Sequence, residues 1–196
     1  MSQRNTYAGP CAEVREDAVL AAAYDVLLDL GPRRATLTEV ARRAGISRMT
    51  VYRRHAELRA LISDVLTAEL ATVMAEASAR AQGPDDRTRI AITVTDAAQA
   101  VAEHPLMARL IDVDPETLLP LLVSRRGSTQ RAAEMLLTRM LEASADGSVR
   151  AADPAVTSRT IVTAAMAFIF SDALARAEGD DGRRWVEFAR LVEGYL

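Results

Sequence analysis

The stretch that decides the fold is TLTEVARRAGISRMTVY, residues 36–52. Thr36 and Glu39 have the spacing of a capping box, which predicts that a helix begins directly after Thr36. Gly45 follows that helix, and glycine readily adopts the left-handed backbone conformation of a sharp turn. Ser47 is a favoured residue for capping a second helix. A short helix, a glycine turn and a second short helix form the layout of a helix-turn-helix.

The second short helix, predicted over residues 48–55, has a basic outer face. Val51 lies on its inner side, whereas Arg48 and Tyr52 are four residues apart and point the same way. Arginine donates two hydrogen bonds to a guanine edge, and hydroxyls and arginines bind phosphates. A solvated arginine-rich helix is the alternative, but the turn, the caps and the basic cluster agree with one another. The residues predicted to contact DNA are Thr36, Thr38, Ser47, Arg48, Met49, Thr50, Tyr52, Arg53 and Arg54.

The charge of the chain is unevenly distributed. The 196 residues carry 24 basic and 27 acidic side chains, a net charge of −3, and every basic residue is arginine. Residues 31–60 hold eight arginines against Glu39 and Glu57. One cysteine excludes an internal disulfide, and two histidines leave little material for a zinc site. No uninterrupted apolar run approaches the ~20 residues of a membrane span, so we expect a cytoplasmic protein that does not bind a membrane. We also expect no metal and no cofactor.

Helical periodicity dominates the rest of the chain, which predicts an all-α fold. We expect three parts: a flexible arm over 1–12, a helix-turn-helix DNA-binding domain over 13–56, and a helical regulatory and dimerisation domain over 57–196. The predicted helices cover about 13–30, 37–44, 48–55, 57–81, 85–104, 105–112, a segment after Asp114-Pro115, 128–144, 155–177 and 183–196.

The quoted stretch closely resembles the DNA-binding signature of TetR-family transcriptional regulators, and the match extends over residues 14–70. The resemblance implies a three-helix DNA-binding domain joined by a long helix to a regulatory domain. It also implies that the protein binds an inverted-repeat operator as a homodimer, most often to repress transcription. Two positions depart from the family pattern: His55 replaces the usual Phe, and Leu58 replaces a Lys that commonly contacts a phosphate. Arg53, Arg54 and Arg59 are placed to compensate, and His55 is expected to be a packed, hydrogen-bonded core residue rather than a pH switch.

The resemblance further implies that residues 85–175 surround a pocket for a small, mainly apolar effector. Met and aliphatic residues at helical spacing are also ordinary core residues, so that alternative stays open for each of them. The candidate effector contacts are Met74, His104, Met107, Arg109, Leu110, Met135, Met140, Met166 and Phe170.

The segment 155–177 is apolar nearly all round, and such a helix needs more than one neighbour to cover it. The last helix has a second apolar stripe, so two helices from each subunit could form a four-helix interface. The residues predicted at this interface are Ile161, Phe168, Ile169, Trp185, Phe188, Val192 and Tyr195.

Two other classes of function are weaker. An enzyme would need a site, but His104, Asp112 and Glu116 span a break in the chain, and the sequence contains no phosphate loop or nucleophile elbow. A helical small-molecule-binding protein of the same fold without operator binding is the other alternative. The intact basic helix at Arg48–Arg54 argues against it.

Overall fold

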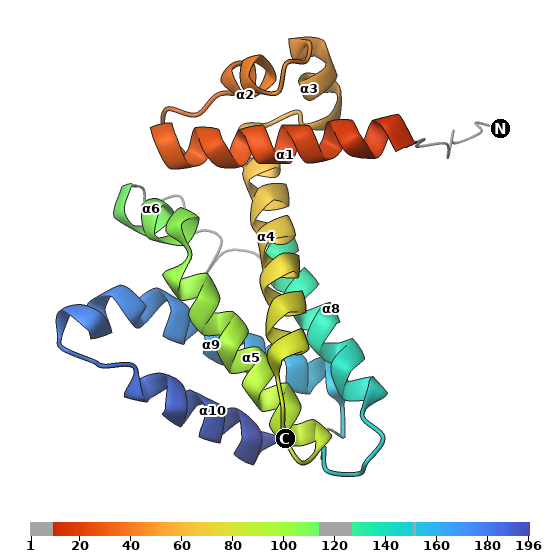
Figure 1. The fold of residues 1–196 in the computed structure, drawn as a ribbon, viewed down its shortest axis with the longest axis vertical. Coiled ribbons are helices and arrows are strands. Elements are labelled where there is room, and N and C mark those ends of the chain that lie inside the picture. The colour runs from red at the N-terminus through yellow and green to blue at the C-terminus, as the bar shows by residue number, and fades with distance from the viewer. Residues whose placement is uncertain (1–9, 114–126, 151) are drawn as a thin grey trace. The chain divides into compact units, whose positions relative to one another are not determined.

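In the computed structural model, the described residues are 10–113, 127–150 and 152–196, and every element within these ranges is a helix (Figure 1). The predicted helix after Asp114-Pro115 lies outside the described residues. The helices are α1 (Pro10–Leu30), α2 (Leu37–Arg43), α3 (Arg48–Arg54), α4 (Leu58–Arg80), α5 (Asp86–Glu103), α6 (Pro105–Val113), α8 (Ser128–Ala143), α9 (Pro154–Ala177) and α10 (Arg183–Tyr195). Helix α1 begins three residues earlier than expected, so the end of the predicted arm is helical.

The helix starts that were predicted from capping residues are confirmed. The Thr36 hydroxyl accepts a hydrogen bond from the Glu39 N–H at 3.1 Å. The carboxylate of Asp153 accepts from the N–H groups of Ala155 and Val156, each at 3.0 Å, with Pro154 as the first helical residue. These side chains satisfy backbone donors that have no partner within the helix.

The described chain forms two compact units, residues 1–65 and 66–196. In the first unit, α2 packs against both α1 and α3. Its core includes Val26 and Val40, and the first turns of α4 add Leu61 and Val65, all at most 1% exposed. Because these turns of α4 are buried here, the first unit extends nine residues beyond the boundary expected at residue 56.

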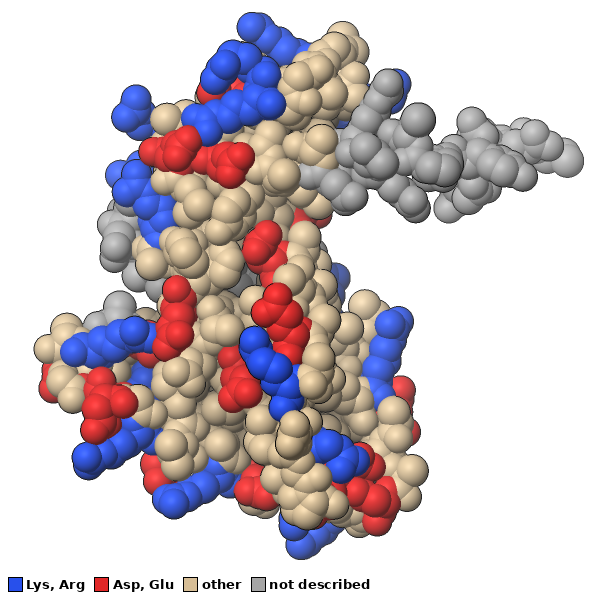
Figure 2. Space-filling view, in the orientation of Figure 1, with Lys and Arg blue, Asp and Glu red and all other residues tan. Residues whose placement is uncertain are grey.

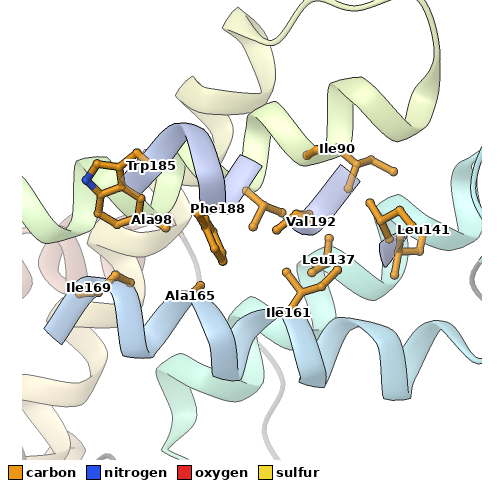
Figure 3. Packing of buried hydrophobic residues seen from close by; sticks show 13 residues of the cluster. Ile90, Ala98, Leu137, Leu141, Ile161, Ala165, Ile169, Trp185, Phe188 and Val192 are labelled. Carbon is orange, nitrogen blue, oxygen red and sulfur yellow. The ribbon is translucent and has the colours of Figure 1, made fainter. Parts of the chain in front are cut away.

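The core of the second unit lies between α5, α8, α9 and α10 (Figure 3). Ile161, Ala165 and Ile169 follow one another at four-residue spacing on the face of α9 that points into this core. The ring of Phe188 on α10 is fully buried, with its centroid 4.6 Å from that of Phe168. The four helices therefore cover each other's apolar faces within one chain.

This packing changes the residues available to a partner. Ile161, Ile169, Trp185, Phe188 and Val192, which were predicted at a dimer interface, are 0–9% exposed inside their own subunit. The apolar face of α9, for which the sequence predicted a partner subunit, is covered by α5, α8 and α10. Phe168 is partly buried against the same core, and only Tyr195, at 48%, is well exposed. Ile161, Ile169, Trp185, Phe188 and Val192 therefore have almost no surface left to bury against a second subunit.

By length and composition alone, one described helix, Pro154–Asp172, could cross a membrane. Helices in the core of water-soluble proteins meet the same criteria. In this chain, the apolar side of the segment contributes to the core just described, and its exposed positions include Arg159, Thr160 and Thr163.

A buried carboxylate holds α9 against α10. Asp172 is 4% exposed and accepts hydrogen bonds from Arg176 Nε at 2.6 Å and from Arg184 Nη2 at 2.8 Å. Arg184 also donates to the Phe168 carbonyl and lies over the Trp185 ring, with its guanidinium carbon 4.9 Å from the centroid. The charge of Asp172 is thus fully compensated by two arginines from two helices.

The loop after α8 is fixed to the start of α5 by a reciprocal exchange of hydrogen bonds. The Asp86 N–H donates to the Asp146 carboxylate at 2.6 Å, and the Ala145 N–H donates to the Asp86 carboxylate at 3.1 Å. The Ser148 hydroxyl and N–H, with the Asp86 N–H, lower the pKa of Asp146 to about 2. Both carboxylates are therefore held in their charged form.

Candidate nucleic-acid interface

The turn between α2 and α3 is built on Gly45. Its backbone has φ = +65°, a conformation that residues with a Cβ rarely adopt. The Ile46 N–H donates to the Ala41 carbonyl at 3.1 Å, which closes the end of α2. Ala41 and Val51 are each 1% exposed, so a small residue on α2 lies buried and an apolar residue on α3 anchors that helix to the unit.

The arginines of this unit fall into two groups. Arg42 and Arg43 both bind Glu39, at 2.7 Å and 3.0 Å, and Arg43 also binds Asp29 on α1 at 2.5 Å. Arg43 therefore ties α2 to α1, whereas the pair of Arg42 with Glu39 lies within α2. By contrast, Arg48 and Arg53 on α3 are exposed, and no carboxylate of the described residues lies within ion-pair distance of either. Figure 2 shows arginines gathered over α2 and the turn before it.

The outer face of α3 presents the side chains expected to meet DNA. With Val51 buried, Met49 and Tyr52 point away from the core and are 77% and 48% exposed. Arg48, Arg53 and Arg54 are also exposed. The predicted contacts on α3 therefore lie together on an accessible surface that combines positive charge, a phenol hydroxyl and one long apolar side chain.

Two of the hydroxyl groups that are predicted to contact DNA also cap helices. The Ser47 hydroxyl accepts from the Thr50 N–H at 3.2 Å and lies 2.8 Å from the Thr50 hydroxyl. Thr36 caps α2 in the same way, whereas Thr38 is half-buried. The Thr36 hydroxyl keeps its O–H donor while it caps α2, so it is able to donate to a phosphate at the same time. Ser47 and Thr50 share one hydrogen bond, which leaves one O–H donor of the two for a phosphate.

His55 occupies the end of α3 and is 5% exposed. Its Nδ1 lies 3.1 Å from an oxygen of Asp64 on α4, and its N–H donates to the Val51 carbonyl. This is the packed, partnered histidine that the sequence suggested. It fixes the end of α3 to α4 at the position where the family usually has Phe.

The ion pairs of Glu39 with Arg42 and Arg43 predict that the stability of the fold depends on pH. Hydrogen bonds from Arg42 and Arg43 lower the pKa of Glu39 from 4.5 to about 2. Because this pKa is lower in the folded chain, the stabilisation is complete above about pH 4.5 and is lost as the pH falls through 2. We expect the urea midpoint of Glu39→Gln to lie below that of the wild type at pH 6 and to converge with it toward pH 2. Glu76→Gln, which removes a looser and more exposed pair with Arg80, is the control expected to differ little at either pH. An equal difference for Glu39→Gln at both pH values would contradict this account.

The candidate effector contacts are distributed over the second unit. Met107 and Met140 pack against its core, whereas Met135 is 52% exposed on α8. Met166 accepts a hydrogen bond from Gln130, and Met74, Arg109 and Phe170 are partly buried. The side chain of Leu110 lies outside the described residues. The structure brings only some of the candidates to one core, and their contact with an effector stays a prediction.

Both ring nitrogens of His104, another candidate, face groups of the same chain. Its Nδ1 accepts from the Leu106 N–H at 3.3 Å, and its Nε2 lies 3.3 Å from Glu69 on α4. His104 therefore joins the start of α6 to α4 at the Pro105 break.

The fold and the exposed basic helix define a helix-turn-helix DNA-binding protein. No family model matches the chain. It is 30% identical over 179 residues to the uncharacterized HTH-type transcriptional regulator Rv2250c of Mycobacterium tuberculosis, covering 91% of this chain and 92% of that protein. The regulator Mb2274c of Mycobacterium bovis matches to the same extent.

Solved structures show the same fold. The TetR-family repressor QsdR of R. erythropolis superposes with a TM-score of 0.73 at 17% identity, over 94% of this chain and 95% of QsdR. The TetR-family repressor AlkX from Dietzia sp., implicated in biodegradation of n-alkanes, gives 0.70 at 17% identity over 97% of each chain. The chain belongs to the HTH-type transcriptional regulators, and its fold is that of the TetR-family repressors. It is a DNA-binding regulator rather than an enzyme.

Proposed function

We propose that the protein is a repressor that binds an inverted-repeat operator as a homodimer and is released by a small, mainly apolar effector. The observation that carries this proposal is the outer face of α3, where exposed Arg48 and Arg53 lack a carboxylate partner among the described residues, beside arginines of α2 that have one. The repressor role is supported by the names of QsdR and AlkX. Such a protein acts in the cytoplasm, at the nucleoid.

Repression is tested by transcription in vitro from a promoter that overlaps the protein's binding site, which is first obtained by selection from random DNA. We expect the protein to lower transcript yield from this promoter and to leave unchanged a promoter whose site has been scrambled. A higher yield would make the protein an activator, and an unchanged yield despite tight binding would remove the repressor role. If the protein binds no DNA sequence in preference to unrelated DNA, the alternative is favoured, a helical ligand-binding protein without operator binding.

The homodimer is supported by the residues of α9 and α10 that the core leaves uncovered. On α9, Val156 and Leu174 are 50% and 62% exposed, and on α10, Val186 and Leu191 are 54% and 52% exposed. A two-fold axis that pairs such faces would present two α3 helices to successive major grooves about 34 Å apart. These positions replace the buried residues predicted from the sequence.

Charges on the uncovered face are expected to break the dimer without unfolding the subunit. We predict that Leu174→Glu combined with Val186→Glu sediments as a 21.2 kDa monomer with unchanged helical circular dichroism, while the wild type sediments at twice that mass. Met135→Glu, at an equally exposed position on α8, is the matched control and is expected to remain dimeric. A wild-type protein that sediments as a monomer at micromolar concentration would contradict the proposal.

Release by an effector requires that the ligand binds one state of the protein more tightly than the other. The coupling is reciprocal, so operator DNA must weaken effector binding by the factor by which the effector weakens operator binding. We expect an apolar compound that releases the operator to obey this equality in paired titrations. If every compound that binds residues 85–175 leaves operator affinity unchanged, the protein is a constitutive DNA binder.

A further inference from the structure

One long apolar side chain lies at the centre of the basic face of α3. With ~100° between successive residues, Met49 lies about 160° around the helix from the buried Val51. Arg48 and Arg53 lie on either side of it, and Tyr52 is its neighbour one turn along. Met49 is 77% exposed, the largest exposed fraction among the large apolar side chains of the described residues.

Single exposed apolar residues are common on protein surfaces and usually need no explanation. The position of Met49 sets it apart, because the helix places it where an α3 inserted into a major groove would meet the edges of the bases. The positive charges on both sides favour a polyanion over an apolar protein surface as the occupant. A DNA duplex is therefore the partner that fits both the charged flanks and the exposed helix.

The chemistry of the groove selects one base. Among the four bases, only thymine presents an apolar group in the major groove, its 5-methyl; the other groups there are hydrogen-bond donors and acceptors. Methionine offers a flexible, polarisable chain that donates no hydrogen bond and adapts to the shape of an apolar contact. The polar edges of guanine, adenine and cytosine would gain nothing from it.

We propose that Met49 reads the 5-methyl group of a thymine in each operator half-site, next to the base pair that Arg48 contacts. This inference rests on the proposed function, because it names the base specificity of the same α3 surface. It assigns α3 a two-part reading: hydrogen bonds from Arg48 and an apolar contact from Met49. The thymine would be required for its methyl group rather than for its hydrogen-bonding edge.

The test removes the methyl group alone. In the site obtained by selection with the full-length protein, each thymine is replaced in turn by deoxyuridine, symmetrically in both half-sites. Burying one methyl group is worth about a fourfold change in affinity, so the two half-sites together predict about 15-fold weaker binding by the wild type at one position. Met49→Ala is expected to bind the thymine and deoxyuridine sites equally. Arg80→Ala, which removes an arginine of an exposed pair on α4, is the control expected to retain the full sensitivity, and melting curves check that Met49→Ala remains folded.

The outcomes separate the two claims. If deoxyuridine costs the wild type and Met49→Ala the same at every position, or if neither half-site contains a thymine, the role of Met49 is wrong while specific binding keeps the proposed function. If the wild type has no preference for any sequence over unrelated DNA, the proposed function itself fails, and the inference fails with it.

Discussion

Replacing Asp172 with alanine is expected to lower the free energy of unfolding by about 3–5 kcal/mol, the cost of breaking a buried ion pair by removing one partner. The Asp172 side chain is 6% exposed, and that of Arg184 is 16% exposed. Without the carboxylate, Arg184 keeps only part of its hydrogen bonds in a poorly solvated position. The ion pair between α9 and α10 is lost at the same time, while the contacts of Phe168 with Arg184 and Phe188 remain.

The matched control for this prediction is Asp181→Ala. Asp181 pairs with Arg183, but these side chains are 59% and 87% exposed, so water screens the interaction. An exposed pair contributes about 0–1 kcal/mol. Urea unfolding of both variants at one fixed protein concentration compares them directly, because the stability of an oligomer depends on concentration. Equal losses for Asp172→Ala and Asp181→Ala would contradict the role of the buried network.

The second large effect concerns DNA. Arg48→Ala is expected to cost about 1–3 kcal/mol of operator affinity for each half-site and to relax the preference at one base pair, because a bidentate contact to guanine is lost. Titrations of the selected site and of variants at each base pair measure both effects. An Arg48→Ala protein that keeps both affinity and sequence preference would show that this side chain reads no base.

Arg53 provides the comparison within the same helix. If Arg53 contacts a phosphate, Arg53→Ala weakens all sequences alike and flattens the dependence of affinity on salt. Arg80→Ala removes the same charge from an exposed pair with Glu76 on α4 and is expected to change neither quantity. A change in base preference with Arg53→Ala would instead assign it to direct readout.

The sequence predicted the first unit well because its signals are local. Thr36 and Ser47 each bond to a backbone N–H three residues away, and Gly45 supplies a backbone conformation that its own lack of a side chain allows. Such contacts depend on spacing along the chain, so they can be found without knowing the fold. The grouping of Arg48, Met49, Tyr52 and Arg53 on one face follows from helical geometry in the same way.

The second unit was harder because its decisive contacts join distant residues. Periodicity showed that α9 and α10 have apolar faces, but it could not show that α5 and α8 of the same chain cover them. Phe188 and Ile161 were therefore assigned to a partner, although the structure buries both in the subunit. The pairing of Asp172 with Arg184, twelve residues apart on another helix, has no signal in spacing at all.

The sequence also could not show which arginines pair with carboxylates and which stay exposed. In sequence, Arg42 and Arg43 look as suited to phosphates as Arg53. In the structure, Arg42 pairs with Glu39 of its own helix, and Arg43 also reaches Asp29 on α1, fourteen residues away. Only clustering was visible from the sequence, and clustering does not separate structural from DNA-facing charge.

Binding-site selection from random DNA with the full-length protein tests the central claim most directly. The account predicts that one inverted repeat is enriched, with half-sites about one helical turn apart, and that Arg48→Ala fails to enrich the same half-site. Enrichment of no sequence by the wild-type protein, or of a single half-site bound by a monomer, would contradict it.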